Sequence, residues 1–286
     1  MNGIVIVDKP ADWTSQDVVS KLRGVFQTRR VGHGGTLDPL ATGVLPVFVG
    51  RATRGVEFFE HAVKTYEAKL RLGITTNTED MTGEILETRP VSVTETEFFA
   101  ALEGFRGEIQ QIPPMYSALK VNGQKLYELA RKGREVERKP RTITIFALDC
   151  LSFDGNTATL RITCSKGTYI RTLCKDIGQA LGCGGCMETL RRVGAGSYTI
   201  EEAVPLAALV ASEDPGQYLR PVDSMFAQYA AVTLTEKQAL RCRNGNSFLI
   251  DLPDGTYRAY DPAGGFLMLA KVESNVMSTI KSFFEV

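Results

Sequence analysis

One aspartate lies in a segment that could present a carboxylate to a ligand. Asp38 follows Gly34 and Gly35 and precedes Pro39, in a run of turn-forming residues. Glycine permits tight backbone turns and proline restricts the chain, so such a loop can hold an acid in one position. An aspartate before proline also commonly bonds the backbone of its own turn. The local sequence therefore leaves two interpretations open, a ligand-facing carboxylate and a purely structural one.

Three other residues could act together with Asp38. Tyr66 lies on the apolar face of an alternating segment, either as a core residue or as a phenol offered to a ligand. Tyr169 and Arg171 lie two residues apart where a predicted strand runs into a predicted helix, so both could reach one pocket. An arginine beside Asp38 would keep the carboxylate ionised at neutral pH and fix its orientation. The alternative for Arg171 is an ordinary surface salt bridge.

The elements that must position these side chains can be predicted from the hydrophobic pattern. Helices are predicted after the capping sequences that start at Thr14 and Thr94, and over about residues 168–181. Apolar or alternating runs predict strands at residues 4–7, 66–72, 142–148 and 157–164. Helices and strands are interspersed without regular alternation, which favours an α+β fold with a mixed or antiparallel sheet.

The last part of the chain has a different pattern, from about residue 230 onwards. Short apolar runs there are separated by Asn244-Gly245, Asp254-Gly255 and Gly264-Gly265, which are typical of β-hairpin turns. A chain of 286 residues has room for about two domains. We therefore expect a larger domain over residues 1–229 and a small, mostly β domain over residues 230–286.

The net charge alone argues against a nucleic-acid partner, but the distribution of charge does not. The chain has 33 basic and 33 acidic residues, which gives a formal net charge of zero. Residues 113–141 carry a net charge of +5 and residues 161–192 of +4, whereas residues 57–111 carry −6. Basic segments with embedded tyrosines suit a phosphate backbone with stacking bases, although runs of lysine and arginine are also common on solvated helix faces.

Several other classes of protein are excluded or unsupported. No apolar run approaches the roughly 18–20 residues of a membrane-spanning helix, and the run at residues 4–7 is too short for a signal peptide. Six unevenly spaced cysteines do not indicate a disulfide-built fold, which favours a reduced, cytoplasmic protein. The lone pair Cys183 and Cys186 and the two histidines, His33 and His61, lack the spacing of a metal site. Since phosphate-binding glycine motifs are also missing, we expect no membrane association, no metal and no cofactor.

Taken together, a series of motifs resembles the bacterial tRNA pseudouridine synthases of the TruB type. The motifs occur in the order found in that family and cover about residues 3–223. They are Val7-Asp8-Lys9-Pro10, Trp13-Thr14-Ser15, Val31-Gly32-His33, residues 35–43, Lys64-Thr65-Tyr66, residues 113–120, residues 166–171 and Leu190-Arg191-Arg192. The resemblance implies a pseudouridine-synthase fold around a mixed, largely antiparallel sheet, with a C-terminal β module like the PUA domain.

The resemblance also implies a reaction and a substrate. Uridine 55 in the TΨC loop of tRNA would be isomerised to pseudouridine, without metal or cofactor. The bond from C1′ to N1 breaks, the uracil rotates, and C1′ rejoins the base at C5. The base must first flip out of the RNA loop, which costs a few kcal/mol. The implied partner is the T-arm stem-loop of tRNA, and we expect a monomer with no obligate protein partner.

Residue by residue, the resemblance implies roles for five side chains of this sequence. Asp38 matches the essential carboxylate, which either attacks C1′ or removes the 2′ proton, and Arg171 matches the residue that holds it. Tyr66 matches the tyrosine that stacks on the base and helps to remove the C5 proton. Tyr169 and Leu190 match residues that pack around the flipped uracil.

Other implied residues grip the RNA. His33 matches a residue that fills the space left in the RNA loop. The basic segment 113–141 corresponds to a thumb-like insertion that closes over the T-loop, with a hairpin turn at Asn122-Gly123 and a short helix at residues 126–131. The residues of this segment that we expect to bind RNA are Lys120, Lys125, Arg131 and Lys132. Lys9 and Pro10 are implied as architectural supports.

Two other functions stay open. An RNA-folding chaperone would bind and release tRNA with catalysis secondary, but such a protein needs neither Asp38 nor Arg171. A guide-RNA-dependent synthase is the second alternative, and the well-developed basic segment 113–141 argues against it because that segment suits direct recognition of the T-arm. The sequence therefore predicts an enzyme that modifies tRNA.

Overall fold

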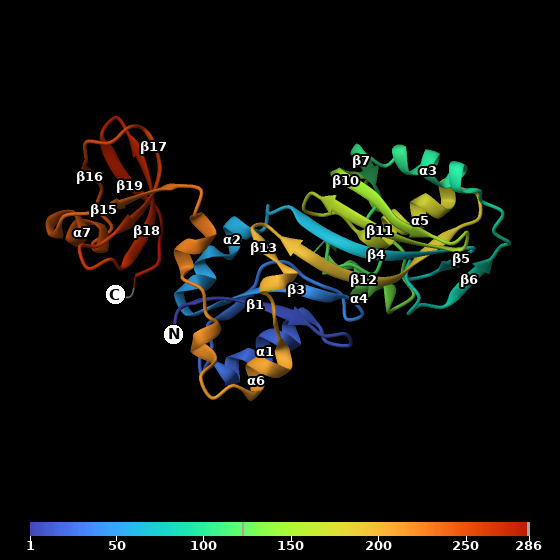
Figure 1. Ribbon diagram of the computed structural model, residues 1–286, viewed down its shortest axis with the longest axis horizontal. Helices are drawn as coiled ribbons and strands as arrows, with labels where there is room; N and C mark the ends of the chain where they lie inside the picture. Colours follow the sequence, from blue (N-terminus) through green and yellow to red (C-terminus); the bar gives the residue numbers. More distant parts are fainter. Residues whose placement is uncertain (122, 285–286) are drawn as a thin grey trace.

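The computed structural model describes residues 1–121 and 123–284, and two separate sheets organise them (Figure 1). A ten-stranded sheet forms the larger part of the elongated molecule, and a five-stranded sheet from the end of the chain lies at one end of it. Among the described strands, the neighbouring pairs are antiparallel apart from two parallel pairs in the large sheet and one in the small sheet. The predicted α+β fold with a mixed, largely antiparallel sheet is confirmed.

The large sheet has the strand order β14-β1-β3-β12-β4-β11-β10-β7, with β2 beside β3 and β13 beside β12. Its strands are β1 (Gly3–Lys9), β2 (Val31–His33), β3 (Thr42–Val49), β4 (Lys64–Leu72), β7 (Gly107–Gln111), β10 (Arg141–Phe153), β11 (Thr157–Cys164), β12 (Gly185–Ala195), β13 (Tyr198–Thr199) and β14 (Val204–Pro205). Each of the strands predicted from the sequence is present, as β1, β4, β10 and β11.

The helices of the larger part are mostly short. They are α1 (Ser15–Val25), α2 (Val56–Phe59), α3 (Glu95–Glu103), α4 (Leu126–Ala130), α5 (Ile170–Ala180) and α6 (Leu206–Ala211), with 3-10 turns at Gly50–Gly55, Ile200–Glu202, Pro215–Tyr218 and Val222–Phe226. The predicted capping boxes start α1 and α3, because the hydroxyls of Thr14 and Thr94 accept the N–H groups of Asp17 and Glu97. No helix in the described part of the chain is both long and apolar enough to cross a bilayer.

Two small hairpins project from the large sheet. One pairs β5 (Ile74–Thr76) with β6 (Ile85–Thr88), and the other pairs β8 (Lys120–Val121) with β9 (Gln124–Lys125). The second hairpin lies within the basic segment, where a turn at Asn122-Gly123 is predicted. Asn122 lies outside the described residues, and Gly123 has a φ of 80°, which suits glycine.

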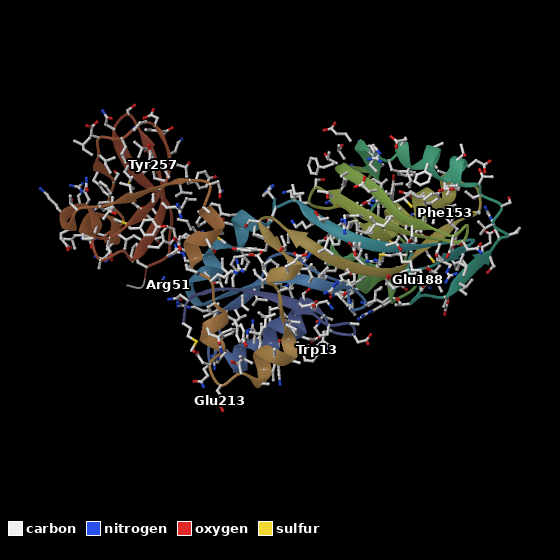
Figure 2. The ribbon with its side chains drawn as sticks, in the orientation of Figure 1. Trp13, Arg51, Phe153, Glu188, Glu213 and Tyr257 are labelled. Atoms are coloured by element: carbon white, nitrogen blue, oxygen red, sulfur yellow. The ribbon has the colours of Figure 1, made fainter. Side chains whose placement is uncertain are left out.

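The core of the larger part uses one face of β4. Ala68, Leu70 and Leu72 alternate along this face and are buried. They share a cluster with buried side chains of the three longest helices, namely Val18, Leu22, Phe98, Leu102, Leu173 and Ile177. Lys69, on the other face, bonds Glu188 of β12 at 2.9 Å. Figure 2 places Glu188 among the strands of the large sheet, distant from Tyr257 in the C-terminal sheet.

One glycine allows two strands to approach next to the loop that carries Asp38. Gly43 is the second residue of β3, where it lies opposite Arg192 of β12. Its φ is 99°, and a Cβ atom at this position would lie 2.2 Å from the carbonyl oxygen of Arg192. Only glycine avoids that clash and this backbone strain. The close approach places the loop at residues 34–42 directly beside β12.

The C-terminal sheet has the strand order β15-β17-β18-β19-β16 and its own apolar cluster. Its elements are β15 (Ala230–Thr233), α7 (Glu236–Arg243), β16 (Phe248–Leu249), β17 (Gly255–Tyr260), β18 (Phe266–Glu273) and β19 (Val276–Ser282). Aromatic contacts join this sheet to the larger part, since the ring of Phe226 lies 5.3 Å from that of Phe58 and 5.7 Å from that of Phe283.

The three predicted hairpin turns of this region have different outcomes. Gly264-Gly265 does join two antiparallel strands, β17 and β18. The prediction for Asn244-Gly245 is wrong, because these residues end α7 and Gly245 has a φ of 74°. A helix C-terminus and a hairpin turn both favour a left-handed glycine, so the dipeptide does not distinguish them. Asp254 precedes β17 and Gly255 begins it, but the two residues make no hairpin with β16, which pairs with β19 instead.

Candidate active site

A cavity of about 450 Å³ opens where β4 and β12 meet the loops before β3 and α5. It collects side chains from segments far apart in the sequence. Six of the residues predicted to form the site line this cavity, namely His33, Asp38, Tyr66, Tyr169, Arg171 and Leu190. The structure therefore brings the predicted reacting residues and the predicted base-contacting residues into one place.

Asp38 and Arg171 form an ion pair in this cavity. Arg171 Nε lies 2.9 Å from Asp38 Oδ2, and the side chain of Asp38 is 40% exposed, so a ligand can still reach its carboxylate. The guanidinium is almost fully buried and is held from other directions. Its Nη1 donates to the carbonyl of Thr78 and its Nη2 to that of Tyr116, at 3.0 and 2.8 Å. Arg171 is thus paired with the carboxylate of Asp38, a contact that favours one orientation of the carboxylate.

A second acid shares Arg171. Asp80, in the loop of the β5–β6 hairpin, has its carboxylate 3.8 Å from Arg171 Nε and is 6% exposed. The same carboxylate accepts from the hydroxyl of Thr78 and from the backbone N–H and hydroxyl of Thr82. A buried carboxylate needs such partners because it has lost its water. Asp80 does not line the cavity, and its carboxylate places a second negative charge beside the Nε atom of Arg171.

The loop of Asp38 is tied to the start of the chain. Lys9 is buried, and its ammonium donates to the carbonyls of Pro10, Trp13 and Pro39. The Ser15 hydroxyl accepts the N–H of Leu37 at 2.8 Å. These bonds fix the backbone on both sides of Asp38. Lys9 thus has the architectural place that the resemblance implied for it.

Tyr66 lies on β4 directly opposite Arg192 of β12. Paired residues of antiparallel strands point to the same side of a sheet, which explains why Arg192 also lines the cavity. Arg192 is buried and donates to the carbonyls of Val44 and Gly35 at 2.6 and 3.1 Å. Burial raises the pKa of the Tyr66 phenol, and the nearby charge of Arg192 opposes that rise. The phenol is therefore neutral at pH 7.

Tyr169 and His33 are two further predicted residues that line the cavity. Tyr169 precedes α5, and its backbone N–H and C=O are both bonded by the side-chain amide of Gln111, at 2.8 and 3.0 Å. Burial raises the pKa of its phenol as well. His33 Nδ1 is buried with no hydrogen-bond partner among the described residues. Burial and then the charge of Arg192 lower the pKa of this imidazole, so His33 is neutral at pH 7.

The four predicted RNA-binding residues of the basic segment lie outside this cavity. Lys120, Lys125, Arg131 and Lys132 belong to the β8–β9 hairpin and the helix α4 region, and Ser117 and Ala118 are the residues of the segment that line the cavity. Lys125 and Arg131 lie 5.4 and 5.3 Å from the ring centre of Tyr127. Such cation–π contacts hold both charges beside an aromatic face.

Sequence reasoning did not single out three residues that lie at this site. Lys64 could have been found, since it lies two residues before Tyr66 and therefore on the same face of the strand. Arg192 belongs to a motif noted in the sequence, but nothing in that motif indicates its burial. Asp80 lies in the threonine-rich loop of the β5–β6 hairpin, which is distant from Arg171 in the sequence. Their contact therefore depends on how that hairpin folds. Among the described residues, no group of three or more His, Cys, Asp or Glu side chains could hold a metal ion.

The sequence of the chain matches two family models. The model of the N-terminal domain of TruB family pseudouridylate synthases matches residues 23–170, and the model of the tRNA pseudouridylate synthase B C-terminal domain matches residues 171–227. The chain belongs to the TruB family of pseudouridylate synthases. It is therefore an enzyme, a pseudouridine synthase, and the resemblance noted in its motifs is confirmed.

Individual relatives match most or nearly all of the length of this TruB family protein. A tRNA pseudouridine synthase B of Clostridium kluyveri is 43% identical, over 99% of this chain and 100% of the relative. One of Dechloromonas aromatica is 47% identical, over 89% of this chain and 85% of the relative. Among solved structures, one described as a Cbf5-Nop10-Gar1 complex matches with a TM-score of 0.73 and 25% identity, over 99% of this chain and 85% of that chain.

Proposed function

We propose that this pseudouridine synthase acts on tRNA and that its target is uridine 55 of the TΨC loop. The observation that carries the proposal is the cavity in which the Asp38–Arg171 ion pair meets Tyr66 and Tyr169. Aromatic walls suit a flipped pyrimidine, and an exposed carboxylate oxygen suits a reaction at its sugar. The names of the curated relatives, tRNA pseudouridine synthase B, support tRNA as the substrate.

The proposed reaction begins when the target base flips into the cavity. Asp38 acts on the sugar, either by attack on C1′ or by removal of the 2′ proton, and the bond from C1′ to N1 breaks. The uracil rotates, C5 bonds to C1′, and the C5 proton is removed with the help of Tyr66. N1 gains a proton as C5 loses one, and any bond between Asp38 and C1′ breaks when C5 joins C1′. Uridine and pseudouridine therefore have the same composition, and the reaction needs no oxidant, reductant or cofactor. Deuterium at C2′ slows the reaction only if the 2′ proton is removed, which separates the two roles of Asp38.

A reaction with purified protein and unmodified tRNA transcript tests this proposal. With uridine labelled by tritium at C5, formation of pseudouridine releases the label into water. We expect release of one tritium per tRNA and none from a transcript with cytidine at position 55. Activity that requires an added guide RNA would contradict the proposal, and so would release from the cytidine-55 transcript.

The basic segment 113–141 is proposed to close over the T-arm. Replacing Lys125, Arg131 and Lys132 together by alanine is expected to weaken tRNA binding and to flatten its salt dependence. Each lost phosphate contact lowers the slope of log K against log salt by about 0.7–0.9. Titration of labelled tRNA at several salt concentrations measures this slope. The control is the triple alanine variant of Lys69, Arg89 and Arg106, three bases of the acidic segment 57–111, and an equal change in both variants would contradict the prediction.

Further roles are proposed for two cavity residues and for the C-terminal part of the chain. His33 is proposed to fill the space that the flipped base leaves in the RNA loop, and Leu190 to pack on the uracil. Residues 230–286 are proposed to form an RNA-binding domain of the PUA type beside a catalytic domain of residues 1–229, which is supported by the separate sheet and core of residues 230–282. We further propose a cytoplasmic monomer that needs no protein partner.

A further inference from the structure

The catalytic cavity has a cationic end that the proposed reaction does not use. We give this name to the part of the cavity lined by Lys64, Lys166, Arg192 and one carboxylate, that of Glu60, because the charges of the other three residues all act on that of Lys64. The charge of Arg171, by contrast, is balanced by Asp38 and by Asp80 outside the cavity. The cationic end therefore has more positive than negative charge in a partly desolvated space, where an anionic ligand is favoured.

Two buried lysines of the chain differ in what their ammonium groups bond. An ammonium group has three N–H donors. Lys9 uses them on three carbonyls, at 2.8, 2.5 and 3.2 Å. Lys64 is only 8% exposed, and its one hydrogen bond within the described chain is to the carbonyl of Glu60, at 3.0 Å. Lys64 therefore has donors left for a ligand in the cavity, whereas Lys9 does not.

The surroundings of Lys64 also favour an anion over a neutral group. Burial and then the charge of Arg192 lower the pKa of its ammonium to about 8. A bound anion offsets both effects, because its negative charge stabilises the ammonium form that burial and Arg192 disfavour. Uracil is neutral, and the negative charges of an RNA loop are on its phosphodiesters. Lys64 lies two residues from Tyr66 on one strand face, about 7 Å along the strand, so it is close to a nucleotide whose base stacks on Tyr66.

We propose that Lys64 binds a phosphodiester that flanks the flipped uridine. This inference rests on the proposed function, since it takes the RNA loop as the ligand of the cavity. Lys64 is then a substrate-binding residue that secures the backbone of the target nucleotide, while Asp38 and Tyr66 act on its sugar and base. The two phosphates that flank the uridine, on its 5′ and 3′ sides, are the candidates.

The test combines a protein change with a change in the RNA. T-arm stem-loops are made with a neutral methylphosphonate in place of one flanking phosphate, and each is assayed with the wild-type enzyme and with Lys64→Met. For wild type we expect one of the two substitutions to lower kcat/KM by about 10- to 100-fold, as for a lost hydrogen bond to a charged group. Lys64→Met lowers kcat/KM for ordinary RNA by a similar factor, and the same methylphosphonate then costs the variant less than about twofold.

The control variant Lys69→Met changes the same residue type on the opposite face of the same strand, where Lys69 pairs with Glu188, and must keep the full sensitivity to the methylphosphonate. Lys64→Met removes a poorly solvated charge, so its melting temperature should not fall. Equal methylphosphonate effects in wild type and Lys64→Met would overturn the inference, and so would an unchanged kcat/KM of Lys64→Met for ordinary RNA. Turnover of ordinary RNA by the wild type separates these results from failure of the proposed function.

Discussion

Asp38→Asn is expected to abolish pseudouridine formation while tRNA binding is retained. Asparagine has nearly the shape of aspartate and keeps an oxygen for Arg171, but it is a poor nucleophile and a poor base. We expect kcat to fall on the order of 10⁴-fold or more. The affinity for tRNA should change by less than about 1 kcal/mol, because asparagine keeps the size of this 40% exposed side chain and the basic segment proposed to bind the RNA is unchanged. Tritium release and filter binding measure the two quantities.

A nearby acid provides the control for this experiment. Asp12 is exposed, and its backbone N–H bonds the carbonyl of Pro39 in the same loop, but its side chain does not line the cavity. Asp12 also has a φ of 64°, a conformation that asparagine tolerates well. Asp12→Asn should therefore keep both turnover and binding. Turnover of Asp38→Asn close to that of Asp12→Asn would rule out the catalytic assignment of Asp38.

Arg171→Met is expected to lower both activity and stability. Without the guanidinium, the Asp38 carboxylate loses its orientation, and kcat should fall by about 10²–10³-fold, as when an oriented donor is removed from other active sites. Asp80 would then be a buried carboxylate without its cationic partner. Loss of one partner from a buried pair typically costs about 3–5 kcal/mol in the free energy of unfolding. Urea denaturation and single-turnover assays check the two effects.

A double variant separates the two roles of Arg171. In Arg171→Met/Asp80→Asn the uncompensated charge is removed, so the free energy of unfolding should recover by about 1–3 kcal/mol relative to Arg171→Met. Activity should not recover, because Asp38 is still without its partner. If the double variant is no more stable than Arg171→Met, the charge of Asp80 is not what destabilises that protein.

The parts of the fold that were predictable depend on local signals. β4 and β11 alternate apolar and polar residues, and α1 and α3 begin at capping boxes that the structure contains. Each of these signals arises from contacts within a few residues. The helix α7 was missed although Thr235 and Gln238 form the same kind of box, because Asn244-Gly245 was interpreted as a hairpin turn.

The candidate site was predictable only in part, for a similar reason. Asp38, Tyr66 and Arg171 stood out by residue type and by the motifs around them. The groups that hold Arg171 did not, because two of them are main-chain carbonyls, those of Thr78 and Tyr116, which any residue type provides. Asp80 acquires its place only when the β5–β6 hairpin folds against α5. Such non-local contacts cannot be inferred from a short stretch of sequence.

The carbonyl of Tyr116 has a consequence beyond its role as an acceptor. Tyr116 belongs to the same segment, residues 113–141, that carries the β8–β9 hairpin and α4. Its bond to Arg171 Nη2 joins that segment, through one side chain, to the carboxylate of Asp38. Any displacement of Tyr116 must carry the guanidinium along or break one of its contacts. The orientation of Asp38 is thus coupled, through the side chain of Arg171, to the position of the segment that we propose binds the RNA.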